Sequence, residues 1–239
     1  YKAKGRLSVL SDKIHGGEGL EATTGIGHTR WATHGKPSDE NSHPHRSASG
    51  RFAVVHNGII ENYAALKKGL QDKGVEFLSE TDTEVIAHLI EQSYTGDFLE
   101  AVRAAVAQLE GSYALGVLCA EHPDEIVAVR KASPLIVGLA EEGNFIASDI
   151  PAVLAHTRRI LQLADGEVVR LTREGAQVMD VSGRPIEKEE LQVTWDVTSA
   201  EKGGHAHFMI KEILEQPQAL PATVSPRTGA DGTLVHDGI

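Results

Sequence analysis

The chain has 239 residues, enough for one large domain or two small ones with a hydrophobic core that needs no disulfide bonds. Its 23 Lys and Arg residues against 34 Asp and Glu residues give a net charge of −11, which argues against a nucleic acid or an anionic membrane as partner. The single cysteine, Cys119, excludes a disulfide framework and a zinc site built from several cysteines, and no apolar run reaches the roughly 18 residues of a membrane span.

The first 50 residues predict loops. Residues 1–24 are polar and glycine-rich, and we expect little regular structure in them. Residues 25–50 hold a dense mixture of Gly, Pro and His, which is typical of an ordered functional loop and not of a helix or a strand interior. Four histidines fall in this block: His28, His34, His43 and His45.

The next region predicts one strand and three helices. Residues 51–56 form a short β-rich run that ends at Asn57-Gly58, a turn signal. Apolar residues then recur every three or four positions from Ile59, which predicts a helix that ends at Gly74. Capping boxes predict two more helices, one from Thr81 with Glu84 as its partner, and one from Asp97, with Glu100 as its partner, to Gly111.

After Gly111 the pattern changes to that of strands. Residues 112–120 are apolar on both faces, as in a strand that is buried on both sides. Further strands are expected at residues 126–131, 134–139, 144–148, 160–164, 167–172 and 176–181, with a brief helix at Pro151-Ala152. Helices followed by many strands predict an α+β fold with a largely antiparallel sheet. Residues 207–216 predict a last helix that stops at Pro217, before an end rich in Pro and Gly.

The loop from His28 to Gly35 has the composition of a site for a small acidic molecule. The guanidinium of Arg30 offers a planar fork of donors that matches a carboxylate, and Trp31 and His34 can supply a wall and a polar group. Glycines beside them allow the backbone to approach a ligand closely. The alternative is a surface loop in which Arg30 pairs with a structural carboxylate.

Asn57-Gly58 and the segment 80–84 are the other candidate sites. The side-chain amide of Asn57 and the backbone N–H of Gly58 can converge on one oxygen, as in an oxyanion hole, although an ordinary turn is the more usual explanation of a lone Asn-Gly pair. Carboxylates at a helix start satisfy free N–H groups, which is a structural role for Glu84. Asp82 is left as a candidate partner for a substrate ammonium group.

Other kinds of site are not indicated. The pairs His43-Pro44-His45 and His205-Ala206-His207 lack the spacings of a zinc site, so we predict no metal. The chain also lacks the G-x-S-x-G motif of a serine hydrolase. Cys119 lies in a predicted strand among apolar residues, where a buried structural cysteine is expected and not a nucleophile.

Five motifs in this order resemble the glutaminase domain of the glutamine–fructose-6-phosphate aminotransferases. They are residues 28–35, 41–45, 56–62, 79–84 and 208–217. The last of them resembles the segment that leads into a phosphosugar isomerase domain in that family. It separates the chain from the amidophosphoribosyltransferases, which share the N-terminal fold but couple it to a different synthase domain.

The resemblance implies an N-terminal-nucleophile hydrolase fold, an αββα sandwich, with residues 1–200 as the glutaminase domain and residues 201–239 as a helix and linker. It implies that Arg30 binds the α-carboxylate of L-glutamine, and Asp82 its α-ammonium. Trp31, Thr33 and His34 would belong to a loop that closes over glutamine, and Asn57 and Gly58 would form the oxyanion hole. The ammonia released would reach fructose 6-phosphate in the isomerase domain and form glucosamine 6-phosphate.

The resemblance also implies the setting of the reaction. The family nucleophile is an N-terminal cysteine whose own amine acts as the base. No cofactor, nucleic acid or membrane is expected, and the full-length protein is expected to be a cytoplasmic homo-oligomer. This chain starts with Tyr1 instead of Met and ends abruptly at Ile239, so we expect a piece of a longer protein, without the nucleophile or the isomerase domain, and inactive by itself. The alternatives are an amidophosphoribosyltransferase glutaminase domain and a non-catalytic amino-acid-binding module.

Overall fold

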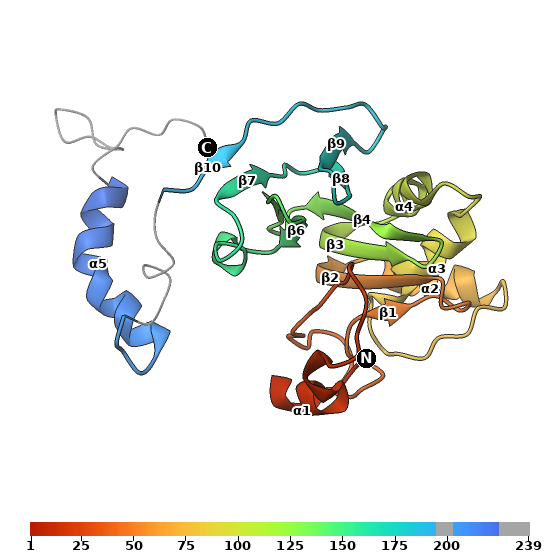
Figure 1. The fold of residues 1–239 in the computed structure, drawn as a ribbon. Coiled ribbons are helices and arrows are strands. Elements are labelled where there is room, and N and C mark those ends of the chain that lie inside the picture. Colours follow the sequence, from red (N-terminus) through yellow and green to blue (C-terminus); the bar gives the residue numbers. More distant parts are fainter. Residues whose placement is uncertain (195–202, 225–239) are drawn as a thin grey trace. The chain divides into compact units, whose positions relative to one another are not determined.

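The computed structural model describes residues 1–194 and 203–224 (Figure 1). The chain divides into two compact units, Tyr1–Val193 and Thr194–Ile239, and each is considered by itself. The boundary predicted at residue 200 falls within residues 195–202, outside the described residues. None of the described helices is long and apolar enough to cross a membrane.

A six-stranded sheet forms the centre of the first unit. Neighbouring strands are antiparallel throughout, as predicted, and follow the order β1-β2-β3-β4-β8-β9. The strands are β1 (His45–Arg46), β2 (Phe52–Ile60), β3 (Gly111–Cys119), β4 (His122–Lys131), β8 (Glu167–Leu171) and β9 (Ala176–Asp180).

A four-stranded antiparallel sheet packs against it. Its order is β10-β7-β5-β6. The strands are β5 (Ile136–Leu139), β6 (Asn144–Ala147), β7 (Arg159–Gln162) and β10 (Leu191–Gln192). One hydrophobic cluster joins the facing sides of the two sheets, with Ala128 and Val169 from the first and Val137 and Leu161 from the second. The double sheet of the predicted sandwich is therefore present.

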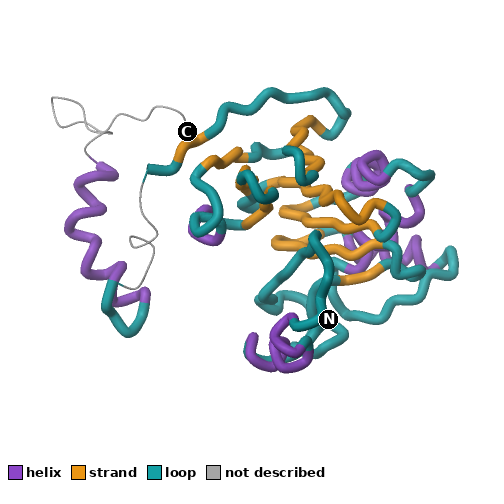
Figure 2. The backbone as a smooth tube through the Cα atoms, viewed as in Figure 1, coloured by secondary structure: helices purple, strands orange, loops and turns teal. Residues whose placement is uncertain are grey.

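Three helices cover the other face of the six-stranded sheet (Figure 2). They are α2 (Tyr63–Gln71), α3 (Glu84–Ser93) and α4 (Phe98–Val106). Alternate residues of β2, Phe52 and Val54, are fully buried against apolar residues of these helices, such as Ile86 and Val102. The outer face of the second sheet is covered by the segment after the short helix η2 (Ile150–Ala152), where the expected brief helix is confirmed.

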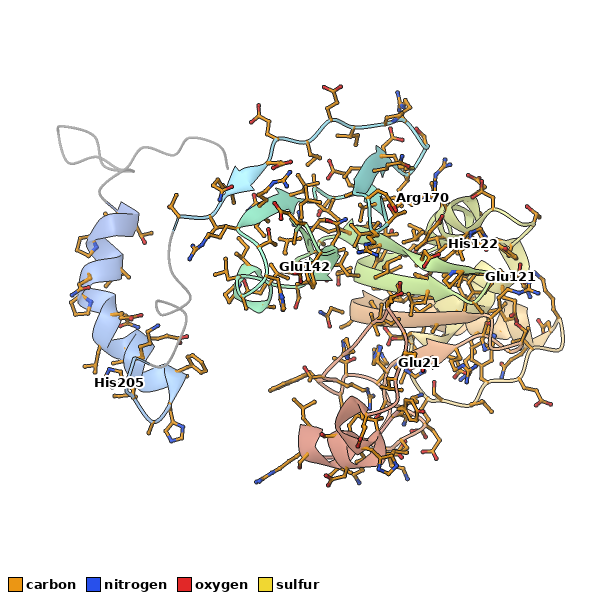
Figure 3. All side chains as sticks on the ribbon, in the orientation of Figure 1. Glu21, Glu121, His122, Glu142, Arg170 and His205 are labelled. Carbon is orange, nitrogen blue, oxygen red and sulfur yellow. The ribbon has the colours of Figure 1, made fainter. Side chains whose placement is uncertain are left out.

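The turn between β3 and β4 is attached to the end of α3. Glu121 in the turn and His122 at the start of β4 lie side by side beyond the end of β3 (Figure 3). The hydroxyl of Tyr94 donates to Glu121 Oε2 at 2.9 Å and lies 3.2 Å from His122 Nε2, and Arg51 Nε lies 2.8 Å from Glu121 Oε1. These contacts join the helical layer to the sheet at the end of β3 that carries Cys119.

The N-terminal segment is more regular than predicted. Residues 1–24 contain the helix α1 (Leu7–Lys13) and the 3₁₀ turn η1 (His15–Gly17), although neither buries a residue. Polar contacts with Asp39 hold the segment: its carboxylate accepts from the backbone N–H of Lys4 at 2.7 Å and from Lys13 Nζ at 3.2 Å. No local pattern indicates this helix, because its stabilising partner lies 26 residues beyond Lys13.

The predicted turn at Asn57-Gly58 is wrong. Strand β2 continues through both residues to Ile60, because β3 pairs with it residue by residue as far as Gly111. Helix α2 accordingly begins at Tyr63 instead of Ile59, and residues 61–62 connect the two elements. Gly74 stands three residues beyond the end of the helix with a positive φ of 86°, as predicted for a residue that ends a helix.

Of the two predicted capping boxes, one is wrong about where its helix begins and the other is confirmed. Helix α3 begins at Glu84 and not at Thr81, because the carboxylate of Glu84 accepts from the backbone N–H groups of Leu78 (2.8 Å) and Ser79 (2.7 Å). Helix α4 does begin after Asp97, whose carboxylate accepts from the N–H of Glu100 at 2.9 Å. It ends at Val106, and Gly111 opens β3 instead of closing the helix.

The second unit contains the helix α5 (Phe208–Val224). The predicted stop at Pro217 is wrong, since the helix continues through Pro217 and Pro221. The two prolines are four residues apart, so their missing N–H groups fall on one face and the remaining hydrogen bonds can continue on the other. The end predicted to be rich in Pro and Gly, beyond residue 224, lies outside the described residues.

Glu84 should make the stability of the fold depend on pH. Burial by itself would raise the pKa of this carboxyl, but His88, the backbone N–H groups of Leu78 and Ser79 and the Ser79 hydroxyl hold it at about 2. A depressed pKa stabilises the fold above pH 4.5, and this contribution is lost as the pH falls towards 2. We expect Glu84→Gln to lower the free energy of unfolding by roughly 3 kcal/mol at pH 7.

Urea unfolding at about pH 7, 5 and 3.5 measures this effect. The difference between the wild type and Glu84→Gln should shrink below about pH 4.5. The control is Glu100→Gln, in an exposed pair with Arg103, which should change stability by less than about 1 kcal/mol. A deficit for Glu84→Gln that is the same at all three pH values would show that the charge of Glu84 is not responsible.

Candidate functional site

One cavity brings together all the site residues that the sequence predicted. It has a volume of about 350 Å³ and lies along the edge of β2, bounded by the loop 28–34 and the segment before α3. The predicted residues that line it are Arg30, Trp31, Thr33, His34, Asn57, Gly58 and Asp82.

Strand β2 presents a free edge to this cavity. Strand β1 pairs with β2 only at Ala53 and Val54, so the rest of that edge has no neighbouring strand among the described residues. The backbone N–H of Ile60 points away from β3 and donates to Asp82 Oδ2 at 2.8 Å. Because N–H directions alternate along a strand, the N–H of Gly58 points to the same free edge. It can therefore serve as a donor to a ligand in the cavity.

Only glycine fits at position 58. Its φ is +127°, which L side chains rarely adopt. A Cβ atom there would lie 2.1 Å from the carbonyl oxygen of Ser112 and 3.1 Å from Ser133 Oγ. The close approach of β3 therefore requires the glycine of the Asn-Gly pair that resembled a turn.

The side chain of Asn57 is held by a histidine. His28 Nε2 lies 2.7 Å from Asn57 Oδ1. An amide oxygen only accepts, so the imidazole donates to it and the Nδ2 group of Asn57 is left for the cavity. The pair Asn57 Nδ2 and Gly58 N–H can thus face a developing negative charge on a ligand oxygen, which is the arrangement of an oxyanion hole.

Asp82 is buried with only 3% of its surface exposed, and its two oxygens have different surroundings. Oδ2 accepts from Ile60, whereas Oδ1 lies 3.9 Å from His34 Nδ1 and belongs to the cavity wall. A carboxylate oxygen of this kind can accept hydrogen bonds from an ammonium group.

Arg30 organises its own loop. Its Nη2 donates to the carbonyl oxygens of His34 and Gly35, the latter at 2.9 Å, and its Nη1 reaches that of Lys36 at 3.4 Å. Among the described residues no carboxylate pairs with this guanidinium, so the alternative of a structural Arg–carboxylate pair is not found. Arg30 keeps an unneutralised positive charge at the cavity.

The rest of the loop is open on one side and anchored on the other. Trp31 is 89% exposed, and Thr33 is also exposed at the rim of the cavity. Asn41 anchors the far side, since its Nδ2 donates to Lys36 O at 2.9 Å and its Oδ1 accepts from the N–H of Glu80 at 2.9 Å. In the sequence, Asn41 stands in the motif of residues 41–45, but no local pattern indicates this anchoring role.

Histidines that the sequence placed only in a loop form a buried group beside the site. The ring of His28 stacks on that of His43 with centroids 4.1 Å apart, and His43 packs edge-on against His45 at 4.8 Å. Burial lowers the pKa of His43 to about 2 and that of His45 to about 3, so both rings are neutral near pH 7. Among residues 1–194 and 203–224, no group of His, Cys, Asp and Glu has the arrangement of a metal site.

A second cavity of about 430 Å³ adjoins the first between the two sheets, and His28, His56 and Asn57 line both. Cys119 lies in neither. It is buried in β3, five residues beyond the partner of Asn57, Ala114, which is roughly 17 Å along the strand. Burial also raises the pKa of its thiol, so the interpretation as a structural residue is supported.

The chain is similar to known proteins along its whole length. A model of the glutamine amidotransferase domain family matches residues 28–155, more than half of the chain. The glutamine–fructose-6-phosphate aminotransferase (isomerizing) of Caldanaerobacter subterraneus subsp. tengcongensis is 56% identical over 238 residues, and that of one strain of Thermus thermophilus is 52% identical over 238 residues. Both alignments cover 100% of this chain, which spans 39% of the length of each relative.

Solved structures share the fold. The glutamine phosphoribosylpyrophosphate (PRPP) amidotransferase from B. subtilis, complexed with ADP and GMP, gives a TM-score of 0.55 at 26% identity and covers 66% of this chain and 35% of its own. A structure described as the allosteric regulatory enzyme of purine biosynthesis gives 0.55 at 27% identity, over 64% of this chain and 34% of its own. These comparisons confirm the predicted fold class and the resemblance stated from the motifs.

The requirement for glycine at position 58 can be tested by adding one methyl group. Gly58→Ala should lower the free energy of unfolding by about 2 kcal/mol or more, because the backbone is strained for alanine and the Cβ meets Ser112 O. Urea unfolding gives the value. Gly69→Ala in α2, where nothing lies within 4 Å of the added atom, is the matched control and should stabilise by about 0.5–1 kcal/mol. Equal effects of the two substitutions would contradict the account of Gly58.

Proposed function

Because the chain belongs to the family of glutamine amidotransferase domains, we propose that its cavity binds L-glutamine and stabilises the oxyanion that forms when the side-chain amide is attacked. The observation that carries the proposal is the placement of two donors, a carboxylate oxygen and an unneutralised guanidinium around one cavity. These groups are Asn57 Nδ2, the Gly58 N–H, Asp82 Oδ1 and Arg30.

The two ends of glutamine suit the charges of the cavity. Asp82 Oδ1 is the acceptor for the α-ammonium group, and the guanidinium of Arg30 is the donor for the α-carboxylate. Three of the five N–H groups of Arg30 are engaged by loop carbonyls, so the carboxylate takes the remaining N–H groups or displaces those carbonyls. Thr33, His34 and the exposed Trp31 belong to the loop that this exchange would draw over the substrate.

The chemical step is acyl transfer to a thiolate. The sulfur attacks Cδ of glutamine, a C–S bond forms and the electron pair of the C=O bond moves to the oxygen. Asn57 Nδ2 and the Gly58 N–H stabilise that oxygen. The C–N bond then breaks with protonation of nitrogen, ammonia leaves, and water hydrolyses the thioester to glutamate. In this family the thiolate belongs to an N-terminal cysteine, whereas residues 1–239 begin with Tyr1.

The complete reaction that we propose is the formation of glucosamine 6-phosphate from glutamine and fructose 6-phosphate, in a cytoplasmic homo-oligomer. Identities of 56% and 52% over the whole chain support this assignment over the amidophosphoribosyltransferases, since the PRPP amidotransferase from B. subtilis is 26% identical and covers 66% of the chain. The other alternative is a non-catalytic amino-acid-binding module. A test of catalysis distinguishes it from the proposed enzyme, because such a module binds its ligand without hydrolysing it.

Residues 1–239 by themselves should bind glutamine but release no glutamate from it. Titration calorimetry measures binding, and a glutamate assay measures hydrolysis. Arg30→Ala should weaken binding at least about tenfold, while Lys68→Ala, in an exposed pair on α2, should not change it. Glutamate release that survives Cys119→Ala would show that the assignment of the chemistry is wrong, and glutamine binding that is equal in the two variants would remove Arg30 from the site.

Catalysis can be tested in a chimaera. Residues 1–239 replace the matching 238 residues of the C. subterraneus relative, which supplies its own flanking sequence. With glutamine and fructose 6-phosphate, the chimaera should form glucosamine 6-phosphate. Arg30→Ala should raise the KM for glutamine more than about tenfold with a smaller change in kcat, since it removes a binding contact for a group that does not react.

Two outcomes would contradict this proposal. A chimaera that has the circular dichroism spectrum of the intact relative, binds glutamine in titration calorimetry, and yet releases no glutamate would favour the non-catalytic module. A fall in kcat for Arg30→Ala with KM unchanged would mean that Arg30 is not the carboxylate anchor. Lys68→Ala is again the control and should leave both constants as they are.

A further inference from the structure

An oxyanion hole built from an asparagine has an ambiguity that must be resolved. The amide of Asn57 can face the cavity with Nδ2, which donates, or with Oδ1, which accepts and would repel a negative charge. Asn57 is exposed, so burial does not fix its orientation. The only hydrogen bond to its side chain among the described residues comes from His28, at 2.7 Å from Oδ1. This bond selects the orientation with Nδ2 towards the cavity.

The imidazole of His28 is itself held in place. Its ring stacks on His43 at a centroid distance of 4.1 Å and an interplanar angle of 25°. His43 packs against His45, and Nε2 of His45 lies 3.1 Å from Thr81 Oγ1. Thr81 directly precedes Asp82, so a continuous series of contacts joins the two ends of the cavity.

We propose that His28, supported by the stacked ring of His43, is a positioning residue that fixes the amide of Asn57 with its donor towards the reacting oxygen. The inference rests on the proposed function, because it assigns a role within the oxyanion hole. It assigns no proton transfer to His28. The Nε2–H group is engaged by Asn57, and Nδ1 is buried, so neither nitrogen is placed to exchange a proton with a ligand.

A proton-transfer role would also require His28 to titrate near pH 7. Burial lowers its pKa, the hydrogen bonds to Asn57 and to the backbone of His56 oppose this, and Arg30 lowers it further. The other groups around it are the imidazoles of His43 and His56, which are likewise kept neutral by burial. A neutral ring and a protonated ring both carry hydrogen on Nε2, so the positioning role does not depend on pH.

Two substitutions of His28 with side chains of similar size show whether its N–H donor or only its bulk matters. His28→Gln keeps an N–H that can reach Asn57 Oδ1, whereas His28→Met fills similar space without a donor. In the chimaera, we expect kcat for glutamine hydrolysis to fall about tenfold or more for Met and less than about threefold for Gln, with KM within about twofold for both. The bound for Met follows from the roughly 10²–10³-fold effect of removing one oxyanion donor completely.

A double-mutant cycle with Asn57→Ala tests whether His28 acts through Asn57. Asn57→Ala alone should lower kcat about 10²-fold. In that background the Gln and Met variants of His28 should have equal kcat, since no amide remains to be oriented. His43→Ala should share the loss of His28→Met, and His43→Phe, which preserves the stacked ring, should recover most of it.

The outcomes distinguish this inference from the proposed function. If Asn57→Ala loses activity but His28→Met and His28→Gln are equal, the inference is overturned and the oxyanion hole stands. If Asn57→Ala leaves kcat unchanged, the oxyanion role of Asn57 fails and the inference fails with it. The pH profile of kcat between about pH 6 and 8 is the last criterion, because an acid limb that disappears in His28→Gln would identify His28 as a titrating group instead.

Discussion

The hydrogen bond from the backbone N–H of Ile60 to Asp82 Oδ2 is the contact on which the site depends. It joins the free edge of β2 to a segment 22 residues further along the chain, at a distance of 2.8 Å. Because the direction of N–H groups alternates along a strand, this bond also sets where the amide of Gly58 points. Because a carboxylate has two oxygens, the same bond leaves Oδ1 of Asp82 for the cavity. A single contact therefore fixes the separation between the donors for an oxyanion and the acceptor for an ammonium group.

The charges of the cavity are local and do not follow the net charge of the chain. The chain carries −11 overall, yet Arg30 stands at the cavity without a carboxylate partner among the described residues. Its bonds to loop carbonyls are charge-assisted only by the donor and are worth roughly 1.5–3 kcal/mol each, whereas a guanidinium–carboxylate pair carries opposite charges on both partners and can be bidentate. The loop is thus held firmly enough to be ordered, and weakly enough for an acidic ligand to displace its carbonyls.

The candidate site residues of the sequence line one cavity, whereas several elements that carry them differ from the prediction. Strands with apolar residues on both faces were identified because burial on both sides leaves a continuous pattern, as in β3. Asn57-Gly58 was predicted as a turn because that dipeptide usually makes one. The real reason for Gly58 is the carbonyl of Ser112 on the neighbouring strand, a contact between residues distant in sequence that no local pattern records. Glu84 was predicted to cap a helix that begins at Thr81, because its spacing from Thr81 is that of a capping box. Its carboxylate instead accepts from the backbone N–H groups of Leu78 and Ser79, which lie before that point in the chain.

Candidate site residues could be named from the sequence where their own motif suggests a ligand. Residues that act through contacts between distant parts of the chain could not. Arg30, Asn57 and Asp82 stand in motifs whose composition suggests a ligand. The link between His28 and Asn57 crosses 29 residues, and the stack of His28 on His43 depends on how the loop 25–50 folds back on itself. The density of histidine in that loop was the only signal, and it did not say which rings would pack together.

The imidazole of His28 meets two requirements at once. Its face stacks on the ring of His43, with centroids 4.1 Å apart, and its Nε2 lies 2.7 Å from Asn57 Oδ1. A phenyl ring would stack without donating, and a primary amide would donate but offers a smaller surface to stack on. Because the stack restricts rotation of the imidazole, the donor stays in one plane beside Asn57. The orientation of one exposed amide therefore depends on how two rings of the loop 25–50 pack together.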